Sequence, residues 1–405
     1  MRFTRARVPS TVRAEARSES VTIGAGYFWF YAGVGAFLPF NVLYYRSLGF
    51  SGMELGLLTA LPAISTAITG PIWGLLADTY GIHRQIMRAV LLLSVLIILS
   101  LAHITAFVPF LFAMAMLSLV LVPVPSLWDS YAVSAVERGG APYGVLRIFG
   151  SLGFTSIVVV LGRVMADGLT TIFIYVYAAC YVIAFLVAWR LPPLGERQAR
   201  NIFGGIGKVI ENHGYRLLLL VAFMISAGYT ALNIYLTLHI QSLGGSTSVA
   251  GVAFATSALS ELPIIGFGAV ILRRLGARNV IFIGLFFYIA RFTLLGFGTE
   301  TSTVLIAQAM HGLSFGMFLI ASVTLAHRLV GREHAATAQA LLAMVSMGLG
   351  SIIGSLAGGI AIDHVSTSMI YRFVALIMAT TLVIFFIGTR RISRDAYDPP
   401  AAGAS

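Results

Sequence analysis

The chain has 405 residues, of which 58% are hydrophobic and 10% are charged, and its mean hydropathy is +0.92. Soluble domains carry more charge and fewer apolar residues, so this composition excludes an ordinary soluble protein. The net charge of +11 does not indicate nucleic-acid binding, because the basic residues gather at the ends of apolar segments, where anionic lipid attracts them.

Twelve apolar segments, each long enough to cross a bilayer as a helix, follow one another along the chain. Their apolar runs are continuous rather than alternating, which excludes a transmembrane β-barrel. We therefore predict an all-α membrane protein with twelve transmembrane helices. The predicted spans are 22–46, 51–77, 87–106, 107–136, 143–166, 169–190, 215–240, 247–272, 279–299, 302–328, 337–361 and 367–389.

The basic residues also predict the orientation of these spans. Lys and Arg are concentrated in the first tail, in the loops that follow the even-numbered spans and in the last tail, which together hold 21 of the 26. Loops rich in Lys and Arg face the cytoplasm, so we expect both termini on the cytoplasmic side of a cell inner or plasma membrane. The first span lacks a small-residue cleavage site, so we expect it to be retained as a helix.

A central polar loop divides the spans into two groups of six. A similar glycine-containing, basic loop follows the second span of each group, within GPIWGLLADTYGIHRQ at 70–85 and AVILRRLGARN at 269–279. Two pseudo-symmetric six-helix bundles are expected of a carrier in which one bundle rocks against the other around a site at mid-membrane. We predict a cytoplasmic tail at 1–21, an N-terminal bundle at 22–190, a central cytoplasmic loop at 191–214, a C-terminal bundle at 215–389 and a cytoplasmic tail at 390–405.

The first of these loops resembles the loop signature of the major facilitator superfamily, in which glycine, aspartate, glycine and basic residues follow one another. Here they are Gly74, Asp78, Gly81 and Arg84. Gly74 permits close helix contact, and Asp78 at a helix end can pair with Arg84, so we expect these residues to act as a conformational gate. The alternative is an ordinary capped helix end, and the second-half loop lacks the aspartate.

An arginine inside a membrane span is costly and is expected to have a carboxylate partner on a facing helix. Arg147 follows the turn between the fourth and fifth predicted spans, and Asp129 precedes that turn by a similar length of helix, so both are expected at comparable depth. We predict that they pair and offer hydrogen bonds to a solute, with Phe154 on the same helical face as a stacking platform. The alternatives are a structural ion pair and, for Phe154, core packing.

The second half contains a further set of polar residues in apolar surroundings, Glu261, Arg291 and His311. Glu261 and Arg291 are expected near mid-membrane on adjacent antiparallel helices, so their side chains should meet. Histidine is the side chain that titrates closest to neutrality, which allows proton-linked chemistry at this set. A structural ion pair is again the alternative.

These residues are similar to those of one branch of the superfamily, the lactose permease and its oligosaccharide and phenylpropionate transporter relatives. The resemblance covers residues 27–389 and implies the twelve-helix major facilitator fold. Asp129 and Arg147, eighteen positions apart, match the sugar-binding pair of that branch, with aspartate in place of glutamate. Phe154 lies where the permease has a sugar-stacking tryptophan.

In the second half, the resemblance implies substrate contacts and a proton-coupling set. The implied substrate contacts are Glu261, Tyr229 and Asn233, and the implied coupling residues are Glu261, Arg291 and His311. The branch carries its transported proton on a glutamate one turn after the histidine, and Ser314 occupies that position here. Coupling in this chain is therefore expected to differ in detail.

We interpret the chain as a secondary active transporter that moves a sugar, a nucleoside or an aromatic acid by alternating access. Proton symport is the expected energy source, because the sequence has no phosphate-binding loop for ATP. The alternatives are facilitated diffusion, efflux and a non-transporting membrane receptor. The substrate and the direction of transport stay open.

An enzyme is not expected, since the sequence has neither an HExxH motif nor paired cysteines. The expected partners are the small-molecule solute, protons and membrane lipid, with no cofactor, no metal and no nucleic acid. We expect the carrier to function as a monomer. Glycines of the eleventh predicted span, such as Gly354 and Gly359, are expected to permit close helix approach.

Overall fold

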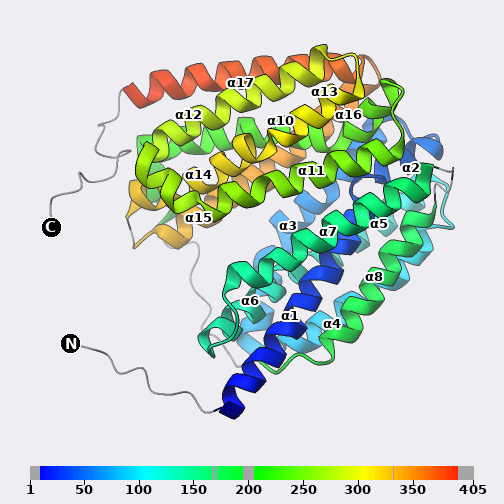
Figure 1. Ribbon diagram of the computed structural model, residues 1–405, viewed down its shortest axis with the longest axis vertical. Helices are drawn as coiled ribbons and strands as arrows, with labels where there is room; N and C mark the ends of the chain where they lie inside the picture. Colours follow the sequence, from blue (N-terminus) through cyan, green and yellow to red (C-terminus); the bar gives the residue numbers. More distant parts are fainter. Residues whose placement is uncertain (1–9, 167, 169–170, 195–204, 332, 391–405) are drawn as a thin grey trace. The chain divides into compact units, whose positions relative to one another are not determined.

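The chain folds into a series of long helices. The computed structural model describes residues 10–166, 168, 171–194, 205–331 and 333–390, without the side chains of 10–16, 71 and 78. The helices of the first half are α1 (Ser10–Phe37), α2 (Asn41–Ser47), α3 (Gly52–Tyr80), α4 (His83–Leu101), α5 (Phe107–Leu121), α6 (Pro123–Glu137), α7 (Tyr143–Ala166) and α8 (Ile172–Ala188) (Figure 1).

The helices of the second half include two π-helical segments, which lie inside longer spans. They are α9 (Ile206–Glu211), α10 (His213–Ser242), α11 (Thr247–Gly266), α12 (Gly268–Phe297), α13 (Thr301–Ala309), η1 (Gly312–Gly316), α14 (Met317–Val330), α15 (Ala335–Ala343), η2 (Met344–Gly350), α16 (Ser351–Ile362) and α17 (Thr367–Arg390).

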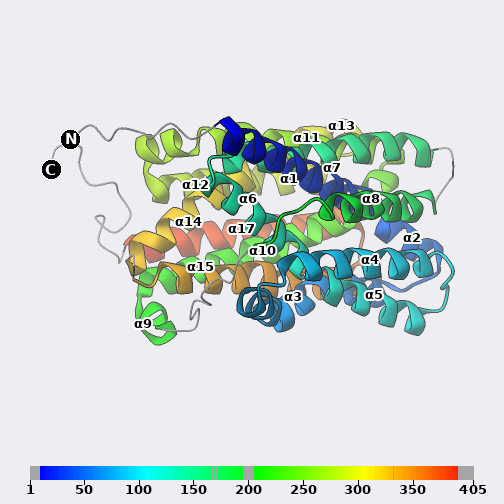
Figure 2. The same ribbon diagram turned by 90° about the horizontal axis from the view of Figure 1, so that it is seen from below.

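The described residues group into two compact units. Of the described residues, the first draws on 10–37, 68–157 and 171–194, and the second on 38–67, 158–166, 168, 205–331 and 333–390, so α3 and α7 contribute to both. In the first unit α8 packs against α1 and α4, and α4 runs beside α5 (Figure 2). In the second unit α17 packs along α10 and α12. The predicted bundle boundaries stay a prediction.

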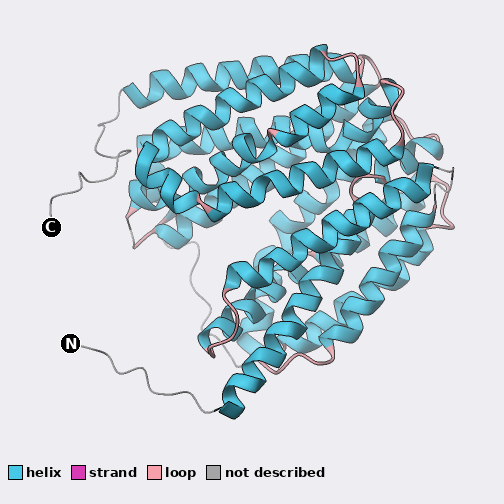
Figure 3. Ribbon diagram, in the orientation of Figure 1, coloured by secondary structure: helices cyan, strands magenta, loops and turns pink. Residues whose placement is uncertain are grey.

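The described residues are mainly helical because the chain is apolar enough to lie in the lipid core of a membrane. A lipid core offers no water to unpaired backbone groups, so a chain this apolar must satisfy them within its own segments. Figure 3 shows only helices and loops over the described ranges. Eleven helical stretches there are long and apolar enough to span a membrane, and α8 is a shorter apolar helix at the sixth predicted span. The count of twelve therefore stays a prediction.

Local sequence explains where several helices break. Pro123 begins α6, where its missing N–H is tolerated, so the span Phe107–Glu137 consists of two helices. Gly276 interrupts α12 with φ of 75°, and Gly81 between α3 and α4 has φ of 62°. Both repeated loops thus turn at a glycine in a backbone region that other residues rarely adopt.

The close packing expected of the eleventh predicted span is confirmed. A Cβ placed on Gly354 would lie 2.2 Å from the carbonyl oxygen of Ala227 on α10. One on Gly359 would lie 2.5 Å from the carbonyl oxygen of Gly52, at the start of α3. These glycines therefore allow α16 to approach two neighbouring helices at backbone distance.

Candidate functional site

A polar and aromatic cluster lies in the first unit, on α1, α6 and α7. Tyr27 and Tyr31 are one helical turn apart on α1, and Tyr143 and Arg147 are one turn apart on α7, so each pair shares a helix face. The hydroxyl of Tyr27 donates to Oδ1 of Asp129 over 2.5 Å, and that of Tyr143 donates to the same oxygen over 3.0 Å. Two phenols thus hold the carboxylate of Asp129.

Arg147 is placed differently from the sequence prediction. Its guanidinium lies 4.2 Å from the ring centre of Tyr31 and 5.8 Å from that of Tyr27. No ion pair within 4.0 Å joins it to Asp129 among the described residues, so the expected direct pair is wrong. The physical reason is the intervening helix α1: the ring of Tyr27 engages both groups, one through its hydroxyl and one through its face.

Two glycines of α7 let α1 reach this position. A Cβ on Gly153 would lie 2.1 Å from the carbonyl oxygen of Phe28, and a Cβ on Gly150 would lie 2.8 Å from the ring of Tyr31 and 2.9 Å from Nη1 of Arg147. Neither glycine was a predicted site residue. The spacing of Gly150 and Gly153 on the arginine helix was the available signal, since small residues at such spacing mark close helix contacts.

Phe154 belongs to the same contact between α1 and α7. A Cβ on Gly35 of α1 would lie 2.7 Å from the carbonyl oxygen of Phe154 and 3.2 Å from its ring. Phe154 is half-buried, so part of its ring is accessible. Its role as a stacking platform stays a proposal.

A second cluster lies in the second unit, on α10, α11, α12 and α13. The side chain of Arg291 is fully buried. Its Nη1 donates to Nδ1 of His311 over 2.8 Å, and its Nη2 donates to Oε1 of Gln308. The Nε2 atom of His311 lies 4.0 Å from Oε2 of Glu261. Arg291 therefore contacts one ring nitrogen of His311 and Glu261 lies nearest the other, and the direct meeting of Glu261 and Arg291 stays a prediction.

Aromatic rings cover this second cluster. Tyr229 stacks on His311 with ring centres 5.5 Å apart and on Phe315 with ring centres 4.9 Å apart. Asn233 donates to the backbone carbonyl of Tyr229 over 3.1 Å, one turn back on α10. The two α10 residues predicted as substrate contacts thus adjoin the predicted coupling set.

Ser314 does not replace the acid expected at its position. Its hydroxyl donates to the backbone carbonyls of Met310 and His311, each over 3.1 Å. Gln308, which was not a predicted site residue, instead contacts the guanidinium of Arg291. Its position one turn before His311 was the signal that pointed to it.

The predicted conformational gate is described only in part, because the side chain of Asp78 lies outside the described residues. Among those residues, a Cβ on Gly74 would meet no atom within 4 Å, so the close helix contact expected there is wrong. The reason is that Gly74 is exposed on α3, with open space at its Cα. Gly81 lies in the turn with a positive φ, and the half-buried Arg84 is the second residue of α4.

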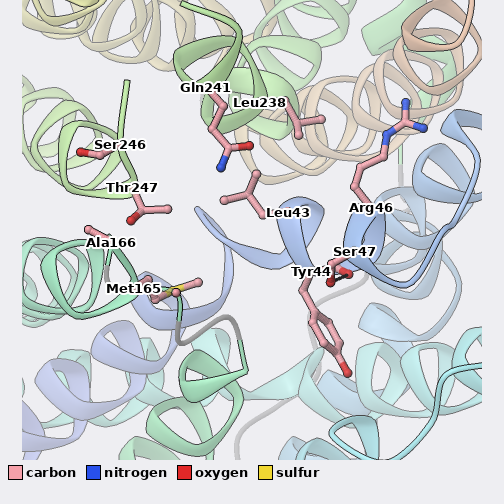
Figure 4. Close-up of a pocket in the computed structure, with 11 residues that line it drawn as sticks. Leu43, Tyr44, Arg46, Ser47, Met165, Ala166, Leu238, Gln241, Ser246 and Thr247 are labelled. Carbon is pink, nitrogen blue, oxygen red and sulfur yellow. Dashed lines mark hydrogen bonds between the residues drawn. The ribbon is translucent and has the colours of Figure 1, made fainter. Parts of the chain in front are cut away.

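A cavity of about 400 Å³ lies in the second unit, away from the predicted site residues. Figure 4 shows side chains from α2, the end of α7, α10 and the start of α11 around it, among them Gln241 and Thr247. Arg46 of α2 lines one side. Its lining is mainly apolar, with few charged groups, so it does not resemble the two clusters.

Arg46 also takes part in a contact between the ends of three helices. Its guanidinium pairs with Asp363, directly after α16, over 3.1 Å, and each side chain is about one-third exposed. The other oxygen of Asp363 accepts the backbone N–H of Gly52 over 2.7 Å. A Cβ on Gly52 would lie 2.3 Å from the carbonyl oxygen of Gly359 and 2.4 Å from the side chain of Ile362, so the helices meet there at backbone distance. We call these residues the Arg46–Asp363 contact.

Comparison with known proteins places this geometry in context. Residues 21–373 match the model of a family described as the MFS_1 like family. The chain is 26% identical over 370 residues to the maltose permease of Geobacillus stearothermophilus, covering 90% of this chain and 93% of that one. It is 23% identical over 368 residues to the probable 3-phenylpropionic acid transporter of Escherichia coli (strain K12), covering 87% and 91%.

Among solved structures, the crystal structure of the nucleoside transporter NupG resembles the chain with a TM-score of 0.80. The two are 18% identical, and the likeness covers 92% of this chain and 98% of that one. At this level of identity the likeness establishes a shared fold.

Proposed function

The chain belongs to the MFS_1 like family of the major facilitator superfamily, and on that premise we propose that it is a secondary active transporter for a small organic solute. It is a multi-pass membrane transporter and not an enzyme, in keeping with its family and its curated relatives. The observation that carries the finer proposal is the cluster of Asp129, Arg147 and three tyrosines. Charged groups inside a span are retained where they meet a solute or an ion.

The chemistry of the cluster supports a ring-containing solute with hydrogen-bonding groups. Arg147 supplies donors in a planar fork, Asp129 supplies acceptors, and the rings of Tyr27 and Tyr31 supply flat apolar surface. Sugars, nucleosides and aromatic acids all combine such features. The relatives named for maltose, 3-phenylpropionic acid and nucleosides suggest the same three classes for a first test.

Arg147→Ala is expected to reduce uptake of the transported compound about 10- to 150-fold, the effect of losing a hydrogen bond to a charged group. The measurement is uptake of labelled maltose, uridine and 3-phenylpropionate into cells that express the wild type or the variant at equal membrane abundance. Arg163→Ala, at the exposed far end of the same helix, is the matched control and should transport normally. Unchanged uptake by Arg147→Ala would make Arg147 a structural residue.

Transport proceeds by alternating access, with both termini in the cytoplasm as the basic loops predict. In this orientation the Arg46–Asp363 contact lies at the outer ends of its helices. It then serves as an outer closure that must part before a solute enters from outside. Support comes from its composition: an exposed ion pair and a glycine contact can separate without exposing a large apolar surface.

Asp363→Ala is expected to make the outer side more accessible about 2- to 5-fold, because an exposed ion pair contributes up to about 1 kcal/mol. The measurement is the labelling rate of Ser355→Cys, one turn before Gly359 and fully buried, by a membrane-impermeant maleimide in a Cys180→Ala background. Glu300→Ala, which removes another exposed acid, is the control. Equal labelling with and without Asp363 would mean that the contact does not control access.

Proton symport is the proposed driving force, supported by a half-buried glutamate beside a buried histidine and arginine in the second unit. Accumulation of the solute should then collapse when a protonophore is added. Uptake that equilibrates and ignores the protonophore would indicate facilitated diffusion. Export would indicate an efflux carrier, and binding without flux would indicate a receptor.

A further inference from the structure

The histidine of the second cluster has a fixed tautomer. The guanidinium of Arg291 has only donors, and its Nη1 lies 2.8 Å from Nδ1 of His311. Nδ1 must therefore accept this hydrogen bond and carries no proton, which leaves the ring hydrogen on Nε2. His311 is accordingly a neutral imidazole whose N–H is on the side of Glu261.

Gln308 holds the arginine in the position that imposes this tautomer. Its Oε1 accepts from Nη2 of Arg291, so two neutral acceptors one turn apart on the same span clamp the two guanidinium nitrogens. Burial of the arginine keeps water from replacing either acceptor. A second proton on His311 would have to enter at Nδ1, against an N–H of a cation at hydrogen-bond distance.

Among the described groups around Arg291 and His311, Glu261 is the carboxylic acid that can carry a proton. The Oε2 atom of Glu261 lies 4.0 Å from Nε2 of His311. The hydroxyl of Ser314 donates to a backbone carbonyl instead. In the described part of the chain, the titratable groups that act on Arg291 are phenols, Tyr229 of α10, Tyr288 of α12 and Tyr371 of α17. Free phenols titrate far above neutrality, so these carry no charge under physiological conditions.

We propose that His311 is a positioning residue that does not itself titrate during transport, and that Glu261 alone in this set takes up and releases the transported proton. The inference rests on the proposed proton symport. Glu261 gains the proton as a carboxylic acid on one side of the membrane and returns it as a carboxylate on the other. Arg291 and Gln308 fix the Nε2–H of His311 on the side of Glu261. Through this N–H, His311 positions the Glu261 carboxylate relative to the buried cation.

The test compares two variants that each remove a titrating group and keep hydrogen-bonding atoms. His311→Asn retains an acceptor near the place of Nδ1, so proton-driven accumulation should stay within about fivefold of the wild type, the cost of one neutral hydrogen bond, with the same pH profile. Glu261→Gln should lose accumulation and pH dependence but keep exchange of labelled for unlabelled solute. Loss of pH-dependent accumulation with retained exchange in His311→Asn would overturn the inference.

Accumulation by the wild type distinguishes a failure of this inference from a failure of the proposed function. Accumulation that ignores a protonophore refutes proton coupling, and the role of Glu261 fails with it. A proton-driven wild type whose Glu261→Gln variant still accumulates solute overturns only the inference.

A spectroscopic measurement covers the case in which a variant fails to fold. The whole wild-type chain, with ¹⁵N-labelled histidine, is titrated in detergent between about pH 5 and pH 8, where ordinary histidines change charge. The buried ring of His311 should keep the signals of a neutral Nε2–H imidazole throughout, and these should vanish in His311→Gln while those of the other buried rings, His83 and His239, remain. A titration between about pH 5 and pH 8 of the signal that is absent from His311→Gln would overturn the assignment.

Discussion

Replacing Gly153 with alanine is expected to abolish measurable uptake and to lower the amount of folded carrier. The new Cβ would lie 2.1 Å from the carbonyl oxygen of Phe28, and a backbone atom of a packed helix cannot rotate away. Overpacking of this kind costs about 1–3 kcal/mol. Relief requires α1 to move away from α7, which removes the ring of Tyr31 from the guanidinium of Arg147.

Gly144→Ala is the matched control, because it makes the same change on the same helix where a Cβ would meet no atom within 4 Å. The measurements are membrane abundance, the apparent thermal midpoint in detergent and uptake of the transported compound. Gly144→Ala should behave as the wild type. Normal uptake by Gly153→Ala would contradict the close contact between α1 and α7.

Arg291→Met is the second substitution with a large expected effect. Methionine fills similar space but removes both donors, which leaves Nδ1 of His311 and Oε1 of Gln308 buried without their partner. It also removes the buried cation that contacts His311 beside Glu261. Leaving a buried acceptor without its donor costs about 1–3 kcal/mol, and two acceptors are affected, so both the thermal midpoint and proton-driven accumulation should fall.

Arg274→Met, on the same helix but exposed, is its control and should change neither quantity. The apparent thermal midpoint and accumulation are measured on the same membrane preparations. An Arg291→Met carrier with wild-type stability would show that the buried guanidinium contributes nothing to the fold. Retained proton-driven accumulation would show that Glu261 functions without it.

The long apolar helices could be predicted from the sequence, because each one is a continuous run of apolar residues that does not depend on distant partners. The partners of Arg147 were predicted less well. Depth along α6 and α7 brings Asp129 to the level of Arg147, but depth does not specify what lies between them. The tyrosines of α1 are remote in sequence, and only tertiary packing places their rings there.

The detailed arrangement of the second cluster was not predicted, for a different reason. Spacing along an ideal helix puts Gln308, His311 and Ser314 on one stripe. The π-helical segment η1 starts directly after His311 and has a different periodicity, so the stripe does not continue. Gln308 and His311 face Arg291, whereas Ser314 bonds to the preceding backbone. The hydrophobic pattern alone does not predict a π-helical segment.

The glycine part of the Arg46–Asp363 contact bears on how fast an outer closure can work. Glycine has no side-chain rotamers, so joining Gly52, Gly56 and Gly359 freezes none and parting them releases none. The glycine backbones can meet again in the same geometry, with only the side chains of Ile362 and Asp363 to pack against Gly52. The absence of a side chain at these glycines also makes the closure sensitive to substitution, since one added methyl group at any of the three positions would hold the helices apart.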